Sequence, residues 1–405
     1  MFVVFVVPFL RGDVELFLRA MLNFGVQLAV VSQDPLAKID EGLHHRLAFW
    51  RVSNSTDTEE LIWAARGLQS QFGKIDRIFS YNEQVQVPVA EVRARLDIHG
   101  LQPDVVLNFR DKGRMKDRLR SRGLPCARSV AAVSPEQVWD FVGEVGFPIC
   151  VKPVDGAASQ STYRVESRED LHGLLMVNQP SWGHPLQIEE FVTGQEHSFE
   201  TATVHGKHLW HSLTRYNPTP LDVMRNPWIQ WRMIVPREID DPMYDDIRQV
   251  GERALDVLGM DTGFSHMEWF RRKDGSIAIG EVGCRPPGSQ IFTSMNWAND
   301  FDLYVEWCRL MIFEEFRPPA QRKYAVGTAF LRGLGGGYVK SVHGLDYVMR
   351  QLQGMLVEWK TPEVGQPAGI TYEGEGYVMV RHPETRAVEE ALELIVNNVR
   401  VELNR

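Results

Sequence analysis

Residues 263–285 read GFSHMEWFRRKDGSIAIGEVGCR, two largely apolar runs on either side of a charged turn. The Asp274-Gly275 dipeptide within the turn is a strong hairpin signal. A hairpin here brings Glu268 and Glu281 close together on neighbouring strands. Two like charges side by side on apolar strands are unfavourable unless a cation neutralises them. The pattern therefore favours a divalent metal site, and a salt-bridged hairpin is the alternative.

The residues just beyond this hairpin extend the same interpretation. Arg285 follows in a Gly- and Pro-rich run, and its planar guanidinium suits a carboxylate or an acyl phosphate. Mg²⁺, with Mn²⁺ as a substitute, is the ion expected beside nucleotide phosphates. His266 lies two positions before Glu268 and points to the same side of the strand. It either touches the substrate or is a hydrogen-bonded structural histidine.

Two lysines upstream occur in contexts that suit phosphate binding. Lys112 follows Asp111 at the start of an expected helix. Lys152 ends the apolar strand expected over 149–152, and the small polar loop DGAASQST follows over 155–162. Such a loop can direct backbone N–H groups and hydroxyls at phosphate oxygens; the hydroxyls here belong to Ser159, Ser161 and Thr162. An ordinary hairpin turn with a solvated lysine is the alternative.

A second acidic segment, IEEFVTGQE over residues 188–196, combines a strand end, a glycine turn and the start of a new strand. The backbone of Phe191 and Val192 can give an adenine edge its amide-type hydrogen bonds. The carboxylate of Glu196 can accept hydrogen bonds from ribose hydroxyls. A surface hairpin with acidic side chains is the alternative for this segment alone.

The N-terminal third alternates strands and helices, which predicts βαβ units and a parallel sheet. The expected strands are 2–7, 26–31 and 77–79, and the expected helices are 13–24, 58–72 and 87–95. Ligands of such sheets collect at the carboxyl ends of the strands, where residues 80–83 (SYNE) lie. A GxGxxG fingerprint is missing, so dinucleotide binding is not supported.

The middle of the chain reads mostly as strands, expected over 149–152, 186–191, 197–205, 208–214, 263–271 and 276–281, with a long helix over 241–258. Residues 112–122 form an expected helix, and Ser134-Pro135-Glu136-Gln137 is a capping box that starts another. Residues 215–231 are long and irregular, which is typical of a lid or substrate loop. A glycine-rich stretch and a mixed segment complete the chain.

The length, charge and composition of the chain exclude some classes of protein. The 405 residues imply two to four structural units. The net charge of -9 lacks the basic footprint of a nucleic-acid-binding protein. The apolar start of the chain reads as a buried strand, no apolar run reaches the ~18 residues of a membrane span, and four cysteines are scattered without metal spacing. A reduced, cytoplasmic protein is expected.

Taken in order, these residues resemble the ATP-grasp superfamily over nearly the whole chain. The resemblance implies that Lys112 and Lys152 bind the ATP phosphates and that Ser159 to Thr162 belong to the phosphate loop. It places Glu189 near the adenine amino group, Phe191 and Val192 at the hinge, and Glu196 at the ribose. Glu268 and Glu281 match the two metal-binding glutamates, and Arg285 matches the arginine that holds the substrate carboxylate or stabilises the transfer.

The resemblance also implies a fold and a reaction. The fold is α/β and α+β: an ATP-grasp fold with a Rossmann-like pre-ATP-grasp domain over 1–108, small and large ATP-grasp subdomains over 109–188 and 189–320, and a C-terminal α+β capping subdomain over 321–405. The reaction is the ATP- and Mg²⁺-dependent joining of a small-molecule carboxylate to an amine, through an acyl phosphate. A homodimer is an arrangement that the resemblance allows.

One departure leaves alternatives open. The superfamily usually has Glu-x-Asn-x-Arg where this chain has Glu281-Val282-Gly283-Cys284-Arg285. Either water or a backbone carbonyl completes the metal shell, or one ion binds more weakly, or the site does not turn over. Gly283 thus motivates one rival function, a nucleotide-binding regulatory protein without turnover. The resemblance allows a second, a biotin-carboxylase-like enzyme that uses bicarbonate. Arg215 and Ser289 join His266 as candidate substrate residues.

Overall fold

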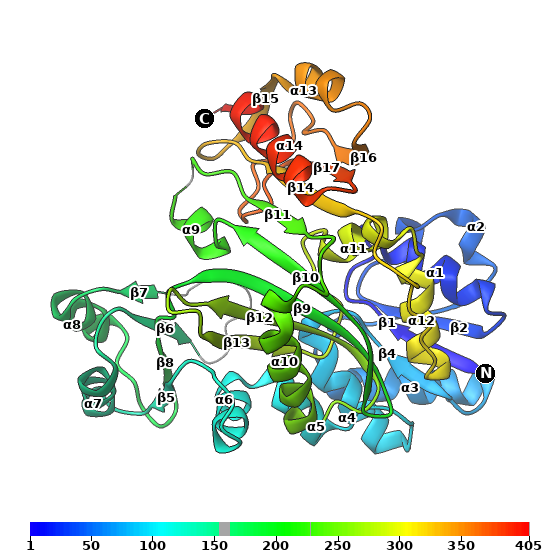
Figure 1. Cartoon of the computed structure of the whole chain (residues 1–405). Helices are drawn as coiled ribbons and strands as arrows, with labels where there is room; N and C mark the ends of the chain where they lie inside the picture. Colours follow the sequence, from blue (N-terminus) through cyan, green and yellow to red (C-terminus); the bar gives the residue numbers. More distant parts are fainter. Residues whose placement is uncertain (154–162, 227, 405) are drawn as a thin grey trace.

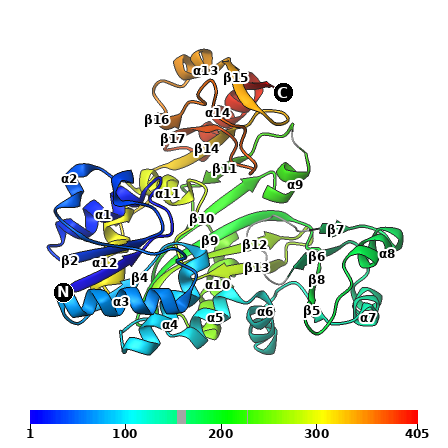
Figure 2. The ribbon, with the colours of Figure 1, turned by 180° about the vertical axis from the view of Figure 1, so that it is seen from behind.

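The computed structural model of the chain describes residues 1–153, 163–226 and 228–404, without the side chains of Lys152 and Pro153. Figure 1 shows three parts: an N-terminal α/β unit, a large curved sheet in the middle, and a small strand–helix unit that projects from one side. The C-terminal elements lie above the large sheet. Figure 2 shows the same arrangement from behind.

The N-terminal unit is a parallel sheet with the order β3-β2-β1-β4. Its strands are β1 (Phe2–Val6), β2 (Gln27–Ser32), β3 (Ala48–Arg51) and β4 (Arg77–Phe79). Its helices are α1 (Val14–Asn23), α2 (Glu41–His44), α3 (Thr58–Phe72), α4 (Gln86–Leu96) and α5 (Pro103–Arg110). Because side chains alternate along a strand, Val3 and Phe5 face the core shared with α1, whereas Val4 and Val6 face α3 and α4.

The central sheet has eight strands in the order β13-β12-β9-β10-β11-β14-β17-β16, and every neighbouring pair is antiparallel. The first five in chain order are β9 (Gln195–Val204), β10 (Lys207–Asn217), β11 (Arg232–Val235), β12 (Gly263–Arg271) and β13 (Ile277–Gly283). The others are β14 (Ala325–Leu331), β16 (Leu356–Lys360) and β17 (Gly376–His382). The hairpin expected from residues 263–281 is thus one edge of this sheet.

Helices pack against both faces of the central sheet. They are α6 (Lys112–Ser121), α9 (Pro220–Arg225), α10 (Asp245–Leu258), α11 (Ile291–Asn299) and α12 (Leu303–Phe313). The C-terminal part adds α13 (Leu345–Gln351), α14 (Thr385–Asn398) and the two-stranded pair β15 (Tyr338–His343) and β18 (Arg400–Asn404).

The small side unit is a four-stranded sheet with the order β5-β8-β6-β7. Its strands are β5 (Ser129–Ala132), β6 (Ile149–Pro153), β7 (Tyr163–Val165) and β8 (Leu186–Glu190), and two helices, α7 (Pro135–Val145) and α8 (Arg168–Val177), complete it. It has a hydrophobic core of its own, around Val138, Leu171 and Ile188. Figures 1 and 2 both show it well separated from the N-terminal unit.

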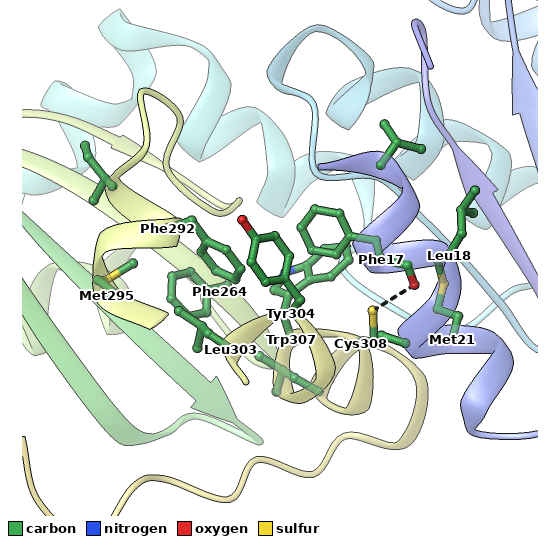
Figure 3. Close-up of a cluster of buried hydrophobic side chains, with 14 of the residues drawn as sticks. Phe17, Leu18, Met21, Phe264, Phe292, Met295, Leu303, Tyr304, Trp307 and Cys308 are labelled. Carbon is green, nitrogen blue, oxygen red and sulfur yellow. Dashed lines mark hydrogen bonds between the residues drawn. The ribbon is translucent and has the colours of Figure 1, made fainter. Parts of the chain in front are cut away.

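A shared aromatic core joins the N-terminal unit to the central sheet. Trp307 on α12 packs edge-on against Phe17 of α1, with ring centroids 4.9 Å apart, and against Phe79 of β4 at 5.5 Å. Phe292 of α11 contacts both Phe17 and Phe264 of β12. Figure 3 shows Phe17, Phe264, Phe292 and Trp307 meeting between α1 and the central sheet. The two units therefore form one continuous core.

Several expectations for individual elements are corrected or extended. Residues 215–231 are not wholly irregular, because β10 continues to Asn217 and α9 forms from Pro220 with Thr219 as its N-cap. The expected helix over 241–258 begins with a 3₁₀ turn at Pro242 before α10. All four cysteines are free. Among the described residues, no helix has both the length and the apolar character needed to cross a membrane.

Candidate active site

The two carboxylates of the hairpin face each other directly. Glu268 of β12 is the register partner of Glu281 of β13, and a bulge follows immediately after Glu268. Directly opposed residues in an antiparallel pair have side chains on the same face of the sheet. Both side chains are about one-third exposed, at 37% and 35%. The sequence-predicted pair is thus assembled at an accessible edge of the sheet.

Lysines from one helix supply the countercharges. Lys112, the first residue of α6, lies with its Nζ 2.8 Å from a carboxylate oxygen of Glu281. One turn later, the buried Lys116 lies 2.7 Å from the equally buried Glu189 of β8. Lys116 had no place in the sequence-based site, because a lone lysine in a highly charged helix reads as a solvated residue. Only the packing of α6 against the side unit shows its buried position.

Arg285 is held by a carboxylate from the N-terminal unit. Its Nε donates to Glu83 at 2.5 Å, and its Nη1 donates to the Pro286 carbonyl at 2.8 Å. Arg110 approaches the other oxygen of Glu83 at 3.9 Å. Glu83 belongs to the segment expected at the carboxyl edge of the parallel sheet, but its pairing with Arg285 links residues too far apart in the chain for any local pattern to indicate.

This ion pair explains the space at Gly283. A Cβ atom added to Gly283 would lie 3.3 Å from Glu83 Oε2 and 3.6 Å from Arg285 Cγ. The volume beside the Gly283 backbone, where the superfamily usually has an asparagine side chain, is therefore occupied by the Glu83–Arg285 pair. A small residue here allows the N-terminal unit to reach Arg285.

We expect Gly283→Ala to lower the free energy of unfolding by about 1 kcal/mol, the lower end of the usual effect of overpacking. The methyl group must push the Glu83 carboxylate away from Arg285. Gly143→Ala is the matched control, because Gly143 lies in α7 with open space around it and alanine is the better helix former by ~1 kcal/mol. Thermal unfolding should therefore give shifts of opposite sign for the two variants, and equal shifts would contradict this account.

His266 connects Glu268 to a buried carboxylate behind it. Its Nδ1 lies 2.8 Å from Glu200, which is fully buried, and its Nε2 lies 3.8 Å from Glu268. Burial alone would lower the pKa of His266, but the two carboxylates outweigh burial and raise the pKa to about 9. For Glu268, burial raises the pKa, yet His266, Lys112 and Arg285 together bring it below its ordinary value. Glu268 is thus kept ionised at neutral pH.

The residues present fit a Mg²⁺ site that is completed by a ligand. Within residues 1–153, 163–226 and 228–404, no three or more His, Cys, Asp and Glu side chains are arranged to hold a metal by themselves. Mg²⁺ usually takes one or two protein carboxylates and fills its octahedron with waters and phosphate oxygens. Glu268 and Glu281, directly opposed on neighbouring strands, are placed to supply these carboxylates.

A cavity of 340 Å³ opens beside these groups. His266, Glu268 and Arg285 line it from the central sheet, and Tyr81, Asn82 and Glu83 line it from the carboxyl edge of the N-terminal sheet. Ser289 also lines it, and its hydroxyl donates to Glu373 at 2.7 Å. The volume lies within the ~300–1,000 Å³ of ordinary ligand pockets. The expectation that residues 80–83 lie at a ligand-collecting edge agrees with this position.

Two of the residues expected at the nucleotide lie on either side of the short connection between β8 and β9. Glu189 is the last but one residue of β8 and Glu196 is the second residue of β9, and both are buried. The N–H of Phe191 donates to the Pro148 carbonyl at 3.3 Å, so it is already engaged within the side unit; Val192 is the next residue of the expected hinge. Ser159, Ser161, Thr162 and the side chain of Lys152 lie outside the described residues.

Arg215 is not brought to the cavity. Its Nε donates to the Tyr244 hydroxyl at 2.8 Å, and its Nη1 lies 3.3 Å from Glu389 of α14. The irregular segment suggested a substrate contact, but Arg215 belongs to the end of β10 and ties that strand to the C-terminal helix. Of the three candidate substrate residues, His266 and Ser289 therefore line the cavity and Arg215 does not.

Comparisons with known proteins identify a domain family and relatives that resemble this chain. The family model for the ATP-grasp domain matches residues 117–298. The chain is 25% identical over 248 residues to an L-arginine-specific L-amino acid ligase of Bacillus subtilis, a match that spans 60% of this chain and 59% of the relative. It is 20% identical over 269 residues to D-alanine–D-alanine ligase B of Clostridium perfringens, covering 63% of this chain and 84% of that one.

Solved structures share the fold over the whole chain. An L-amino acid ligase from Bacillus licheniformis superimposes with a TM-score of 0.77 at 16% identity, covering 100% of this chain and 99% of that one. N5-carboxyaminoimidazole ribonucleotide synthetase from Thermotoga maritima gives a TM-score of 0.73 at 17% identity, with the same coverage. The expected fold class is thereby confirmed. Residues 117–298 therefore match the ATP-grasp domain, and the fold of the whole chain is that of these solved enzymes.

Proposed function

We propose that this protein is an ATP- and Mg²⁺-dependent ligase that joins the carboxylate of a small, amino-acid-like molecule to an amine, releasing ADP and phosphate. The observation that carries the proposal is the meeting of three features at one place. The opposed pair Glu268 and Glu281, the guanidinium of Arg285 and a ligand-sized cavity all adjoin one another. The ligase names of two relatives, which act on amino acids, support the substrate class.

Different residues are proposed to bind different parts of ATP and its Mg²⁺ ion. Glu268 and Glu281 would hold Mg²⁺, which when bound neutralises phosphate charge during transfer. Lys112, now paired with Glu281, is placed to meet phosphate oxygens at the same carboxylate. Lys152 and the loop that contains Ser159, Ser161 and Thr162 are proposed partners of the phosphates. Glu189, Glu196 and the Phe191–Val192 backbone are proposed partners of the nucleoside.

The proposed reaction has two steps. An oxygen of the substrate carboxylate attacks the γ-phosphorus of ATP, the bond to the β-phosphate oxygen breaks, and ADP leaves. The lone pair of a neutral amine then attacks the acyl carbon, phosphate leaves with the C–O bonding electrons, and the amine loses a proton. Arg285 is suited to orient the carboxylate through Nη2, because its Nε and Nη1 already donate to Glu83 and Pro286. Preorganised charge of this kind supplies much of the catalysis in such transfers.

The test is ADP release with pairs of L-amino acids and small acids, together with mass spectrometry of the products. We expect ADP and amide in equal amounts, only when both a carboxylate and an amine are present, and no ADP after chelation of the metal. ATP binding with no ADP from any pool would overturn the ligase and leave a regulatory nucleotide-binding protein. Turnover that depends on bicarbonate alone would instead indicate a carboxylating enzyme.

A further inference from the structure

The part of the cavity that the proposed chemistry does not use is formed by the N-terminal helix α1 and its neighbours. Asp13, at the N-terminus of α1, and Phe17, one turn later, both line the cavity. Tyr81 stacks on Phe17 with ring centroids 5.0 Å apart and an interplanar angle of 22°. Further aromatic rings on the lining are Tyr216, Trp231, Phe292 and Tyr372. A carboxylate thus stands among aromatic rings at the wall formed by the N-terminal unit.

The Asp13 carboxylate has no cationic partner of its own. Its oxygen accepts a hydrogen bond from the Tyr304 hydroxyl at 3.0 Å, and in the described parts of the chain no Lys, Arg or His forms an ion pair with it. It does not cap α1 either, because no N–H of that helix donates to its side chain. Burial raises the pKa of Asp13, and the negative charge of Glu358 adds to this effect. A cation placed here would relieve both costs.

The other charges on the lining are already compensated. Glu83 is paired with Arg285, and His266 is paired with Glu200 behind it. Glu268 belongs to the proposed metal site. Asp13 is therefore the carboxylate on this lining that has neither an ion-pair partner among the described residues nor a role in the proposed chemistry.

Unpaired polar atoms on the lining are mostly acceptors. Asn82 Oδ1 and Gln290 Oε1 are buried and have no hydrogen-bond partner among the described residues. Unpaired buried acceptors are costly, so such atoms indicate a ligand that donates. One donor, Trp231 Nε1, is likewise unpaired and suits a carbonyl or carboxylate oxygen of the same ligand. The surrounding aromatic faces also attract a cation, by ~0.5–2 kcal/mol each.

We propose that the carboxylate substrate of this enzyme is an amino acid with a cationic side chain, whose ammonium or guanidinium group binds between Asp13 and Tyr81 while its carboxylate reaches Arg285. This inference rests on the proposed function, which it makes more specific. Asp13 and Tyr81 act here as specificity-determining residues. Arginine and lysine share the required chemistry, and their neutral analogues citrulline and norleucine lack it.

The experiment is calorimetric binding to the full-length protein in the presence of Mg²⁺ and a non-hydrolysable ATP analogue. We expect the wild type to bind arginine or lysine at least ~10-fold more tightly than citrulline or norleucine, because a hydrogen bond to a charged group contributes ~1.5–3 kcal/mol. Asp13→Asn should remove most of this preference by weakening only the cationic ligand. Asp104→Asn, which changes an exposed aspartate in the first turn of α5, should leave the preference intact.

Three outcomes would overturn the inference. The wild type could show no preference for the cationic amino acid, or the Asp13→Asn variant could retain the wild-type preference. In the third outcome, Asp13→Asn weakens the binding of the cationic and the neutral amino acid by the same factor. If the circular dichroism spectrum shows that Asp13→Asn fails to fold, the inference is tested by the wild-type preference and by the Tyr81→Leu variant. Tyr81→Leu should also lose the preference for the cationic amino acid. Binding needs no turnover, so the proposed function is tested separately. Cation-selective binding without ADP release would contradict the proposed ligase activity and support this binding site. ADP release with neutral amino acids alone would support the ligase activity and contradict the binding site.

Discussion

Replacing Glu281 by glutamine is expected to lower the rate of ADP release by a factor of ~10²–10³, the usual cost of removing one group that stabilises charge in a transition state. The substitution keeps the size of the side chain and removes its charge. Glu268 then faces a neutral amide, and Lys112 loses the carboxylate 2.8 Å from its Nζ. The metal should bind more weakly, so the concentration of Mg²⁺ that gives half-maximal rate should rise as the maximal rate falls.

The comparison for this variant is Glu252→Gln, which removes the same charge from an exposed position on α10. It should retain the wild-type rate and the wild-type Mg²⁺ dependence. ADP release should be followed with a coupled assay over a range of Mg²⁺ concentrations. A Glu281→Gln variant with the wild-type rate at all of them would show that the opposed carboxylates are a structural pair and that the metal binds elsewhere.

Trp307→Ala is expected to lower the free energy of unfolding by ~3–5 kcal/mol, as large aromatic-to-alanine changes in cores do. Trp307 is 1% exposed and packs against Phe5, Phe17 and Phe79, which belong to three different elements of the N-terminal unit. Figure 3 shows this ring at the junction of α12 and α1. Its removal leaves an empty space where the N-terminal unit meets the central sheet. Phe17, which lines the cavity beside Arg285, should therefore be less firmly packed.

Denaturant unfolding followed by circular dichroism is the measurement. Trp182→Ala is the control, because Trp182 is 88% exposed and surface changes usually stay within ~0.5 kcal/mol. Since a chain of this size need not unfold in one step, the transition of the N-terminal unit should be followed separately. A Trp307→Ala variant as stable as Trp182→Ala would mean that the two units do not share one core.

The sequence was sufficient to predict a helix or strand where the residues at its ends mark its boundaries. Residues 58–72 were expected as a helix and form α3 with those bounds, because Asp57 caps its N-terminus and Gly73 ends it at a positive φ. The strand over 263–271 is also confirmed, since the hairpin turn sets its register. In the site, the turn brings the two strands together, but the direct opposition of Glu268 and Glu281 also depends on the bulge between Glu268 and Trp269, which the turn does not set.

Local signals failed where both sides of an element are buried. Helices α11 and α12 have buried residues all around, including Phe292, Met295, Leu303 and Trp307, so their sequences lack the polar face that marks a surface helix. The site residues that sequence reasoning missed, Glu83 as the partner of Arg285 and Lys116 as the partner of Glu189, meet their partners only through tertiary packing. Neither pair has a spacing that a local pattern could reveal.

The continuity of the eight-stranded sheet has a consequence during synthesis. The ribosome releases β11 well before its neighbour β14 has been made, and β14 is itself the strand that joins β11 to β17. Until β14 emerges, the nascent chain presents β11 as a bare edge, and such edges pair readily with other chains. The C-terminal elements therefore protect the protein from aggregation as it leaves the ribosome, and truncated chains that end before Ala325 should be recovered mainly as inclusion bodies.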